Sequence, residues 1–146
     1  MPTMSPETVR DAMVPEPTTL GAGASAQEAG RCFADNGEVR AIFVTEEGGR
    51  LLGVVTRKTL VREVVAAGLD PGSVSVREIA EPPNFTLDAG LGLEGAFRFL
   101  EEQDLERVPV VEGGRLVGVL SRAVVQRRLA EDEPPEGEPE TGSLVL

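Results

Sequence analysis

The sequence contains no histidine, tryptophan or tyrosine and only one cysteine, Cys32. Without histidine and with a single thiol, the chain cannot build zinc sites of the histidine or multiple-cysteine type, nor a histidine-activated nucleophile. One cysteine also excludes an intramolecular disulfide framework. Aromatic residues make up 3% of the chain, all of them phenylalanine, which excludes extended stacking platforms. These absences remove most enzyme classes and most metal sites.

Other catalytic and targeting signals are also missing. There is no G-x-S-x-G or G-x-x-x-x-G-K-[ST] motif, and Ser25, Ser75 and Ser121 each fit a helix N-cap. No apolar run approaches the roughly 20 residues that cross a bilayer, and the N-terminus MPTMSPETVR lacks an export signal. We therefore predict a cytoplasmic protein that is not an enzyme, holds no structural metal and has no membrane partner.

The charge is negative and concentrated at one end. The formal net charge is −11, and residues 131–146 hold six acids and no base. Nucleic-acid binding rests on neutralisation of phosphates by a basic surface, so no nucleic-acid partner is expected. The run EDEPPEGEPETG is acidic and proline-rich without an apolar face, and it predicts a disordered tail over 132–146.

What the chain does contain is an internal repeat. Residues 49–57 read GRLLGVVTR and residues 114–122 read GRLVGVLSR, 65 positions apart. The alignment extends outward with small changes of offset, so that VRD at 9–11 matches VRE at 76–78. A chain that repeats one unit is expected to build two quasi-equivalent sites or surfaces. We place the first domain at 1–68, with a short N-terminal helix, and the second at 69–131.

Each half is predicted to be a β-α-β-β-α unit of an α/β fold. Capping boxes at Ser25 with Glu28 and at Ser75 with Glu78 start two helices, and Gly37 is a natural helix end. The β-branched runs 40–45 and 51–55 predict a hairpin with glycines in its turn. The remaining expected segments are a helix from Ser5 to Met13, an extended piece at 18–20, helices at 25–36, 56–67, 92–103 and from 122, and strands at 107–111 and 116–120.

The junction between the last strand and the last helix of each half carries the strongest candidate chemistry. Thr56 and Ser121 end their strands at the positive end of a helix, where an anion or polar ligand edge is favoured. Arg57 and Arg122 follow, each a fixed charge with forked donors suited to phosphate. Glycines inside the strands allow a ligand or a neighbouring backbone to approach. The alternative is that the hydroxyl residues are ordinary N-caps and the glycines serve packing alone.

At these residues the chain resembles a tandem pair of cystathionine-beta-synthase (CBS) domains, the Bateman module, over roughly residues 8–130. The resemblance implies two repeats packed about a pseudo-two-fold axis, with clefts between them. In the family these clefts often bind AMP, ATP or S-adenosylmethionine, and modules commonly pair into dimers. Relatives that bind ligand read G-h-h-[TS]-x-x-D at the strand end, where the Asp accepts from ribose hydroxyls. Here the Asp positions are Thr59 and Val124.

The resemblance also implies which other residues face the clefts. Adenine-facing loops correspond to Ala12, Met13 and Val14 and to Ile79, Ala80 and Glu81. The residues before the central strands correspond to Arg40, Ala41 and Ile42 and to Arg107, Val108 and Pro109. Because Thr59 can still form one neutral hydrogen bond and Val124 none, the first site is expected to be the better of the two.

Two functions remain open at this stage. The first is a regulatory module that senses AMP, ADP, ATP or S-adenosylmethionine, with or without Mg²⁺, without a resident cofactor, as a homodimer that signals to an unidentified protein partner in trans. The second is a dimerisation or scaffold module that has lost nucleotide binding, as the missing aspartates suggest. Phe97, Leu91 and Leu93 offer apolar surface for a subunit interface in either case.

Overall fold

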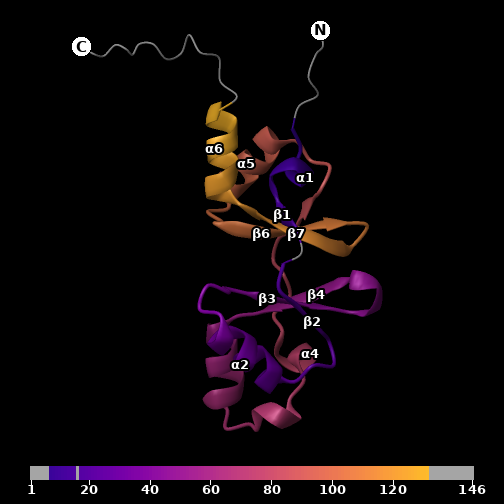
Figure 1. The fold of residues 1–146 in the computed structure, drawn as a ribbon, viewed down its shortest axis with the longest axis vertical. Coiled ribbons are helices and arrows are strands. Elements are labelled where there is room, and N and C mark those ends of the chain that lie inside the picture. Colours follow the sequence, from indigo (N-terminus) through magenta and orange to yellow (C-terminus); the bar gives the residue numbers. More distant parts are fainter. Residues whose placement is uncertain (1–6, 16, 132–146) are drawn as a thin grey trace, which may run out of the picture.

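The computed structural model describes residues 7–15 and 17–131. It consists of two bodies stacked along the long axis of the molecule (Figure 1). The sheets of the two bodies lie toward the waist between them, and the helices lie at the two outer ends. The predicted α/β class is confirmed. Within the described ranges, no helix is both long enough and apolar enough to cross a membrane.

The first body contains a three-stranded sheet in the order β2-β3-β4. β2 is parallel to β3, and β3 and β4 form the predicted antiparallel hairpin. The helix after β4 begins as α3 and continues as a π-helical turn. The elements of this body are β2 (Thr19–Gly21), α2 (Ala26–Asp35), β3 (Ile42–Thr45), a 3₁₀ turn (Glu47–Gly49), β4 (Leu51–Val55), α3 (Arg57–Leu60), the π-helical turn (Val61–Val65), a 3₁₀ turn (Pro71–Ser73) and α4 (Val76–Ile79).

The second body contains a four-stranded sheet in the order β1-β7-β6-β5. β5 is parallel to β6, and β6 and β7 form the second predicted hairpin. The last helix, α6, packs beside α5 on the outer side of the sheet (Figure 1). The elements are α1 (Val9–Ala12), β1 (Val14–Pro15), β5 (Leu87–Asp88), α5 (Leu93–Glu102), β6 (Arg107–Glu112), β7 (Arg115–Ser121) and α6 (Arg122–Glu131).

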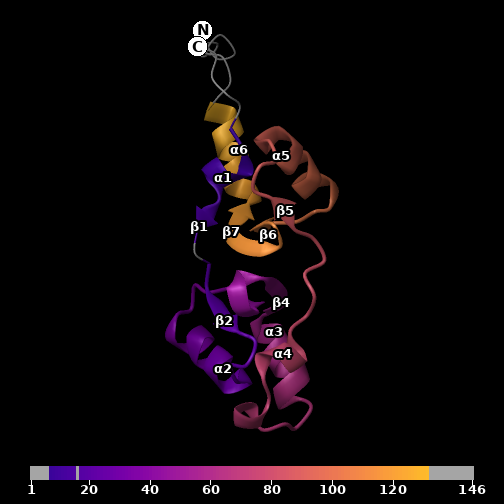
Figure 2. The ribbon, with the colours of Figure 1, turned by 90° about the vertical axis from the view of Figure 1, so that its right-hand side faces the viewer.

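Each body is completed by a segment from the other half of the sequence. β1 pairs with β7, and Val9 of α1 is fully buried in the core of the second body. In the quasi-equivalent position, Val76 of α4 is fully buried in the core of the first body. We call these two segments the crossing segments: one contains α1 and β1, and the other contains α4 and Glu81. They run on opposite sides of the waist (Figure 2). The predicted boundary at 68 therefore divides the sequence, but the short N-terminal helix assigned to the first domain packs in the second body.

Equivalent ion pairs hold the two exchanged helices, α1 and α4, against the opposite body. Arg10 of α1 forms a bidentate ion pair with Glu112 at the end of β6, with N–O distances of 2.5 and 3.1 Å. Arg77 of α4 pairs with Glu46, the residue after β3, at 2.8 Å. The sequence offset between the arginines matches that of the internal repeat, so the same contact is made twice. Exposed ion pairs contribute little to stability individually, and these mainly orient the two helices.

Two glycines allow the exchanged segments to cross the sheets. Gly53 of β4 and Gly118 of β7 are both buried. A Cβ on Gly53 would lie 2.8 Å from the carbonyl oxygen of Glu81, and one on Gly118 would lie 2.8 Å from that of Val14. The backbone of the crossing segment, and not a ligand, therefore occupies the space that these glycines leave open. Of the two explanations that the sequence allowed, the structure supports close packing.

Strand side chains alternate between the helices and the waist. Those that face the helices form two separate hydrophobic cores, one in each body. The first core contains Ile42, Val44 and Val55, and the second contains Val108, Val110 and Leu120. Leu93 is 2% exposed and belongs to the second core, so it is not free for a subunit interface as expected; Leu91 is 38% exposed. Phe97 is partly buried and packs against the same core.

Several predicted element ends can be compared with the structure. The capping boxes at Ser25 and Ser75 are confirmed. The first helix begins at Val9 with Thr8 as its N-cap, and the predicted start at Ser5 lies outside the described residues. α2 ends at Asp35 with Asn36 as its C-cap, which confirms the predicted end near Asn36, although Gly37 does not adopt the positive φ of a glycine helix stop. The predicted tail at 132–146 also lies outside the described residues.

The crossing glycines generate the first prediction. Gly53→Ala and Gly118→Ala should each destabilise the fold by about 1–3 kcal/mol, because the new methyl group meets backbone that cannot easily move. Gly30→Ala in α2 is the matched control, since a Cβ there meets nothing within 4 Å. It should be neutral or stabilising by roughly 0.5–1 kcal/mol. Urea unfolding of the three variants measures this, and equal stabilities would contradict the crossing constraint.

The fastening of α1 generates a second prediction, on pH. Arg10 hydrogen-bonds Glu112 and lowers the pKa of that carboxyl, and the backbone N–H of Thr8 does the same to the pKa of Asp11. Because both folded pKa values are depressed, their stabilisation is complete above the unfolded values, near pH 4, and is lost as pH falls through the folded values. Urea midpoints should therefore fall on acidification below about pH 4.5, and less steeply in Glu112→Gln than in the exposed control Glu102→Gln. Identical pH slopes in the two variants would contradict this.

Candidate functional site

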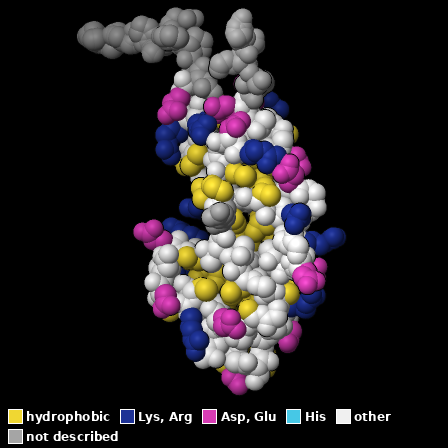
Figure 3. Space-filling view, turned by 45° about the vertical axis from the view of Figure 1, so that its right-hand side comes forward, with side chains coloured by type: hydrophobic (Ala, Val, Ile, Leu, Met, Phe, Trp, Pro, Cys, Tyr) yellow, Lys and Arg dark blue, Asp and Glu magenta, His cyan; other side chains and the backbone are white. Residues whose placement is uncertain are grey.

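A pocket of about 560 Å³ lies between the two sheets at the waist. Its walls come from both bodies and from the crossing segments, and hydrophobic side chains gather at this waist on the surface (Figure 3). The lining residues are Val14, Pro17, Thr18, Asn36, Glu38, Val39, Arg40, Ala41, Phe43, Val54, Glu81, Pro82, Pro83, Asn84, Phe85, Leu105, Arg107, Val108, Pro109, Val119 and Ser121. Strand residues such as Phe43, Val54, Pro109 and Val119 contribute to this lining together with residues of the loops.

Two arginines supply positive charge to a mostly apolar surface. Arg40 lies just before β3, and Arg107 is the first residue of β6. Both are exposed, and neither forms an ion pair or a side-chain hydrogen bond with another residue that the structure describes. Their guanidinium groups therefore remain available to bind an anion. The carboxylates among the lining residues are Glu38 and Glu81.

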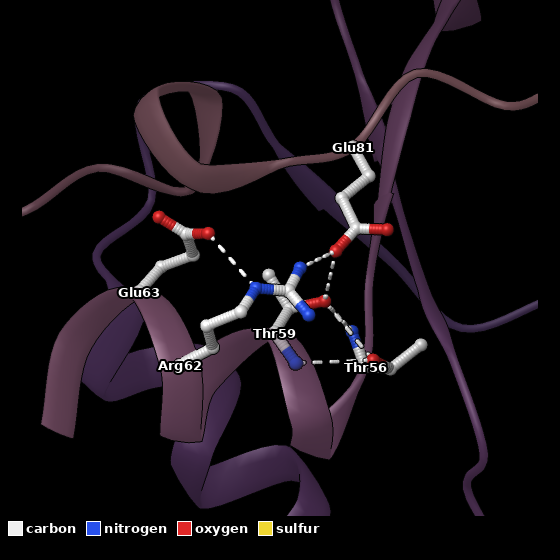
Figure 4. Close-up of polar contacts among 5 residues, drawn as sticks. All are labelled: Thr56, Thr59, Arg62, Glu63 and Glu81. Atoms are coloured by element: carbon white, nitrogen blue, oxygen red, sulfur yellow. Dashed lines mark hydrogen bonds and ion pairs between the residues drawn. The ribbon is translucent and has the colours of Figure 1, made fainter. Parts of the chain in front are cut away.

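The predicted first site is filled by the protein's own groups (Figure 4). The N–H of Thr56 donates to Thr59 Oγ1 at 3.1 Å, and the N–H of Thr59 donates to Thr56 Oγ1 at 3.2 Å. The Thr59 hydroxyl donates to the carboxylate of Glu81 at 3.4 Å, and the same carboxylate oxygen accepts from Arg62. Thr59 is 1% exposed, and neither threonine lines the pocket.

The predicted second site has a different character. Ser121 lines the pocket, and its hydroxyl accepts from the N–H of Val124 at 3.4 Å as an N-terminal cap of α6. Val124 is partly buried against the second core. Arg107 stands opposite Ser121 in the register of β6 and β7. The geometry therefore favours the second site over the first, which reverses the order expected from the sequence.

Arg57 and Arg122 hold the ends of helices and do not line the pocket. The guanidinium of Arg57 donates to the carbonyl oxygens of Val39 at 2.7 Å and Phe33 at 3.1 Å, and it lies 4.8 Å from the Phe33 ring centroid. Arg122 donates to Glu106 at 2.9 Å and to the carbonyl of Leu100 at 3.4 Å. These contacts favour a structural role for both, in place of the expected phosphate contact.

The other predicted residues divide between core, crossing segments and pocket. Ala12, Ile42 and Ile79 are buried in the hydrophobic cores. Met13 and Ala80 lie against Gly118 and Gly53 at the two crossings. The structure brings Val14, Arg40, Ala41, Glu81, Arg107, Val108, Pro109 and Ser121 together around one pocket.

Sequence reasoning missed one wall of the pocket. Pro82, Pro83, Asn84 and Phe85 form the link between α4 and β5, and all four line it. In the sequence, the proline pair predicts only a break between two elements. Its position beside Glu81, inside a loop that the resemblance already places at the cleft, was the available signal.

Within residues 7–15 and 17–131, no three side chains of the aspartate, glutamate or cysteine type gather as a cluster that could hold a metal ion. The absence of histidine from the sequence leaves carboxylates as the main candidate ligands.

Comparison with protein families identifies both halves. A model described as "CBS domain" matches residues 9–66 and again residues 76–131. The chain belongs to the CBS domain family. The resemblance inferred from the repeated strand and helix junction is thereby confirmed, as is the tandem arrangement of two CBS repeats.

Relatives of similar length are found in bacteria. Hypoxic response protein 1 of Mycobacterium tuberculosis is 30% identical over 124 residues, which cover 85% of this chain and 86% of that protein. A crystal structure of Hypoxic Response Protein I with two coordinated zinc ions has a TM-score of 0.72 at 29% identity, covering 84% of this chain and 98% of that one. A crystal structure of CBSX2 in complex with AMP has a TM-score of 0.67 at 25% identity, covering 85% and 96%.

The role of Arg57 generates the third prediction. Arg57→Ala should lower stability by about 1–2 kcal/mol, because the carbonyls of Phe33 in the last turn of α2 and of Val39 in the loop after it lose their charged donor. Lys58→Ala, an exposed neighbour with the same charge change, should stay within about 0.5 kcal/mol of the parent. Thermal unfolding measures both. A loss of ligand response in Arg57→Ala without loss of stability would instead return this residue to the binding site.

Proposed function

We propose that the protein is a regulatory module that binds an adenine nucleotide or a related adenosyl ligand in the pocket between its two CBS repeats. The observation that carries the proposal is the pair Arg40 and Arg107, which stand without described acidic partners on the rim of an apolar pocket. A pocket of about 560 Å³ is within the range that encloses a small organic ligand.

The lining suits the two ends of a nucleotide. Ala41 and Pro109 offer apolar surface for the faces of a purine, and the arginines offer forked donors for phosphate. The AMP complex of CBSX2 supports this ligand class, because that chain shares the fold over most of its length. AMP, ADP, ATP and S-adenosylmethionine are therefore the ligands to compare, each with and without Mg²⁺.

Affinity should be modest. Neither Thr59 nor Val124 supplies the carboxylate that accepts from ribose hydroxyls in ligand-binding relatives. A hydrogen bond to a charged acceptor contributes roughly 1.5–3 kcal/mol, so its absence weakens a nucleotide by about ten- to hundredfold. The module would then respond to a ligand that is abundant in the cell.

Binding would act through the arrangement of the two bodies. The pocket walls come from both bodies, so a ligand that contacts both favours the arrangement in which those walls are correctly spaced. Only such differential affinity shifts an equilibrium between arrangements. The change would reach a protein partner in trans, with a homodimer as the expected assembly.

A scaffold module without ligand is the second candidate. The observation in its favour is the occupation of the first site by Thr56, Thr59, Arg62 and Glu81 (Figure 4). If both clefts lacked ligand, the chain would serve assembly alone.

The fourth prediction tests binding directly. The purified chain is unfolded thermally with AMP, ADP, ATP and S-adenosylmethionine, each with and without Mg²⁺. A ligand that binds only the folded state stabilises it by about 2.7 kcal/mol at a hundredfold excess over its dissociation constant. Arg107→Ala should lose most of that shift, whereas Arg98→Ala, an exposed arginine outside the pocket, should retain it.

The outcomes separate the two candidates. A midpoint shift that depends on Arg107 supports the nucleotide sensor. Unchanged midpoints with every ligand at millimolar concentration, in a chain that folds normally, would reject the sensor in favour of the scaffold. A shift that Arg98→Ala removes as strongly as Arg107→Ala would mean binding outside the pocket.

A further inference from the structure

Four pairs of quasi-equivalent positions can be compared between the two repeats, and the side chains differ at three of them. The repeat offset relates Thr56 to Ser121, Thr59 to Val124, Arg62 to Arg127 and Glu81 to Val14. Backbone pairing supports the last relation, because Glu81 pairs with Val54 of β4 and Val14 pairs with Val119 at the matching place in β7. The two sites can therefore be compared group by group within one molecule.

At the first site, one carboxylate accepts hydrogen bonds from two donors. The same oxygen of Glu81 accepts from the Thr59 hydroxyl and from Arg62 (Figure 4). Because that hydroxyl donates to Glu81, the Thr56 hydroxyl must donate the bond that joins the two threonines at 3.0 Å. Every polar hydrogen that the two threonines direct into the site is thus used within the protein.

At the second site the internal carboxylate has no counterpart. Val14 occupies the position of Glu81 and lines the pocket, and it is 58% exposed. Arg127 occupies the position of Arg62 and forms no ion pair with any other residue that the structure describes. Ser121 and Val14 both line the pocket, whereas Arg127 is not among its lining residues. At position 14 the second site therefore has valine where the first has the acid that pairs with Arg62.

We propose that Glu81 is a built-in occupant of the first site, so that the module binds one anionic ligand per chain, at the second site, and not two. The inference rests on the proposed function and refines it. An anionic ligand group, such as a nucleotide phosphate, would meet the negative charge of Glu81 at the first site and would have to displace it from Arg62. At the second site it meets Ser121 and Arg107 with no acid at position 14.

The position of Glu81 makes it a determinant of which ligands are excluded. Its carboxylate lies at the edge of the pocket, and its side chain is 50% exposed, so it contributes little to packing. A half-exposed ion pair adds little to stability, and replacement of Glu81 should leave the fold intact. Its effect is then confined to the site.

The fifth prediction counts ligands. Isothermal titration calorimetry with AMP as the probe should give one molecule per chain for the parent. Glu81→Val, which copies the second site into the first, should give two, because Arg62 and Thr59 are then free to donate. Glu63→Val is the matched control: it removes the other acid bound to Arg62 and lies outside the pocket, so the count should stay at one.

The reverse exchange tests the same idea at the second site. The double variant Val14→Glu with Val124→Thr copies the carboxylate and the hydroxyl of the first site into the second, at the positions that correspond to Glu81 and Thr59. It should lower AMP affinity by at least tenfold. Val14→Gln with Val124→Thr, of similar size without the charge, should lower it less. Thermal unfolding without ligand verifies that each variant is folded.

The results distinguish this inference from the proposed function. Two AMP per parent chain, or one in both the parent and Glu81→Val, would overturn the role of Glu81 and leave the sensor intact. No binding to either chain at millimolar AMP would reject the sensor, and the inference with it. One in the parent, two in Glu81→Val and loss in the reverse exchange would establish both.

Discussion

The crossing of each exchanged segment over the opposite sheet is the constraint on which the rest of the structure depends. Two backbones approach so closely at Gly53 and Gly118 that a methyl group would meet a carbonyl oxygen at 2.8 Å. The crossing places α1 in the second core and α4 in the first, so neither core is complete without both halves. A repeat of some 65 residues buries too small a fraction of its surface to be robust alone, and the exchange joins two such repeats into one cooperative unit.

The same crossing creates the pocket. Because each segment enters one body and leaves toward the other, the residues beside the crossing glycines, Val14 and Glu81, come to stand at the waist between the sheets. The proline pair after Glu81 continues that wall. The crossing therefore both joins the two bodies and forms the pocket wall. A ligand in the pocket would contact the segments that hold the two bodies together.

The sequence predicted the fold well because the repeat is a strong local signal. Strands, hairpins and capping boxes depend on residues a few positions apart, and those at Ser25 and Ser75 are confirmed. The exchange of α1 and α4 depends on contacts between distant segments, which the local sequence pattern does not predict. Arg57 shows the limit for the site: its place after a strand suits a phosphate, but carbonyls of Phe33 and Val39 lie within reach and take its donors.

The difference between the clefts also depends on partners far apart in the sequence. Thr59 was expected to be the better hydroxyl because it retains a donor where Val124 has none. The Thr59 hydroxyl donates to Glu81, 22 positions away in the sequence. A buried hydroxyl whose hydrogen bonds are already satisfied has no donor left for a ligand. Ser121 has a poorer local pattern, yet it lines the pocket, and the residue at the corresponding crossing is Val14 in place of an acid. In a repeated fold, a site is therefore decided less by its own motif than by what the other repeat's crossing segment brings to it.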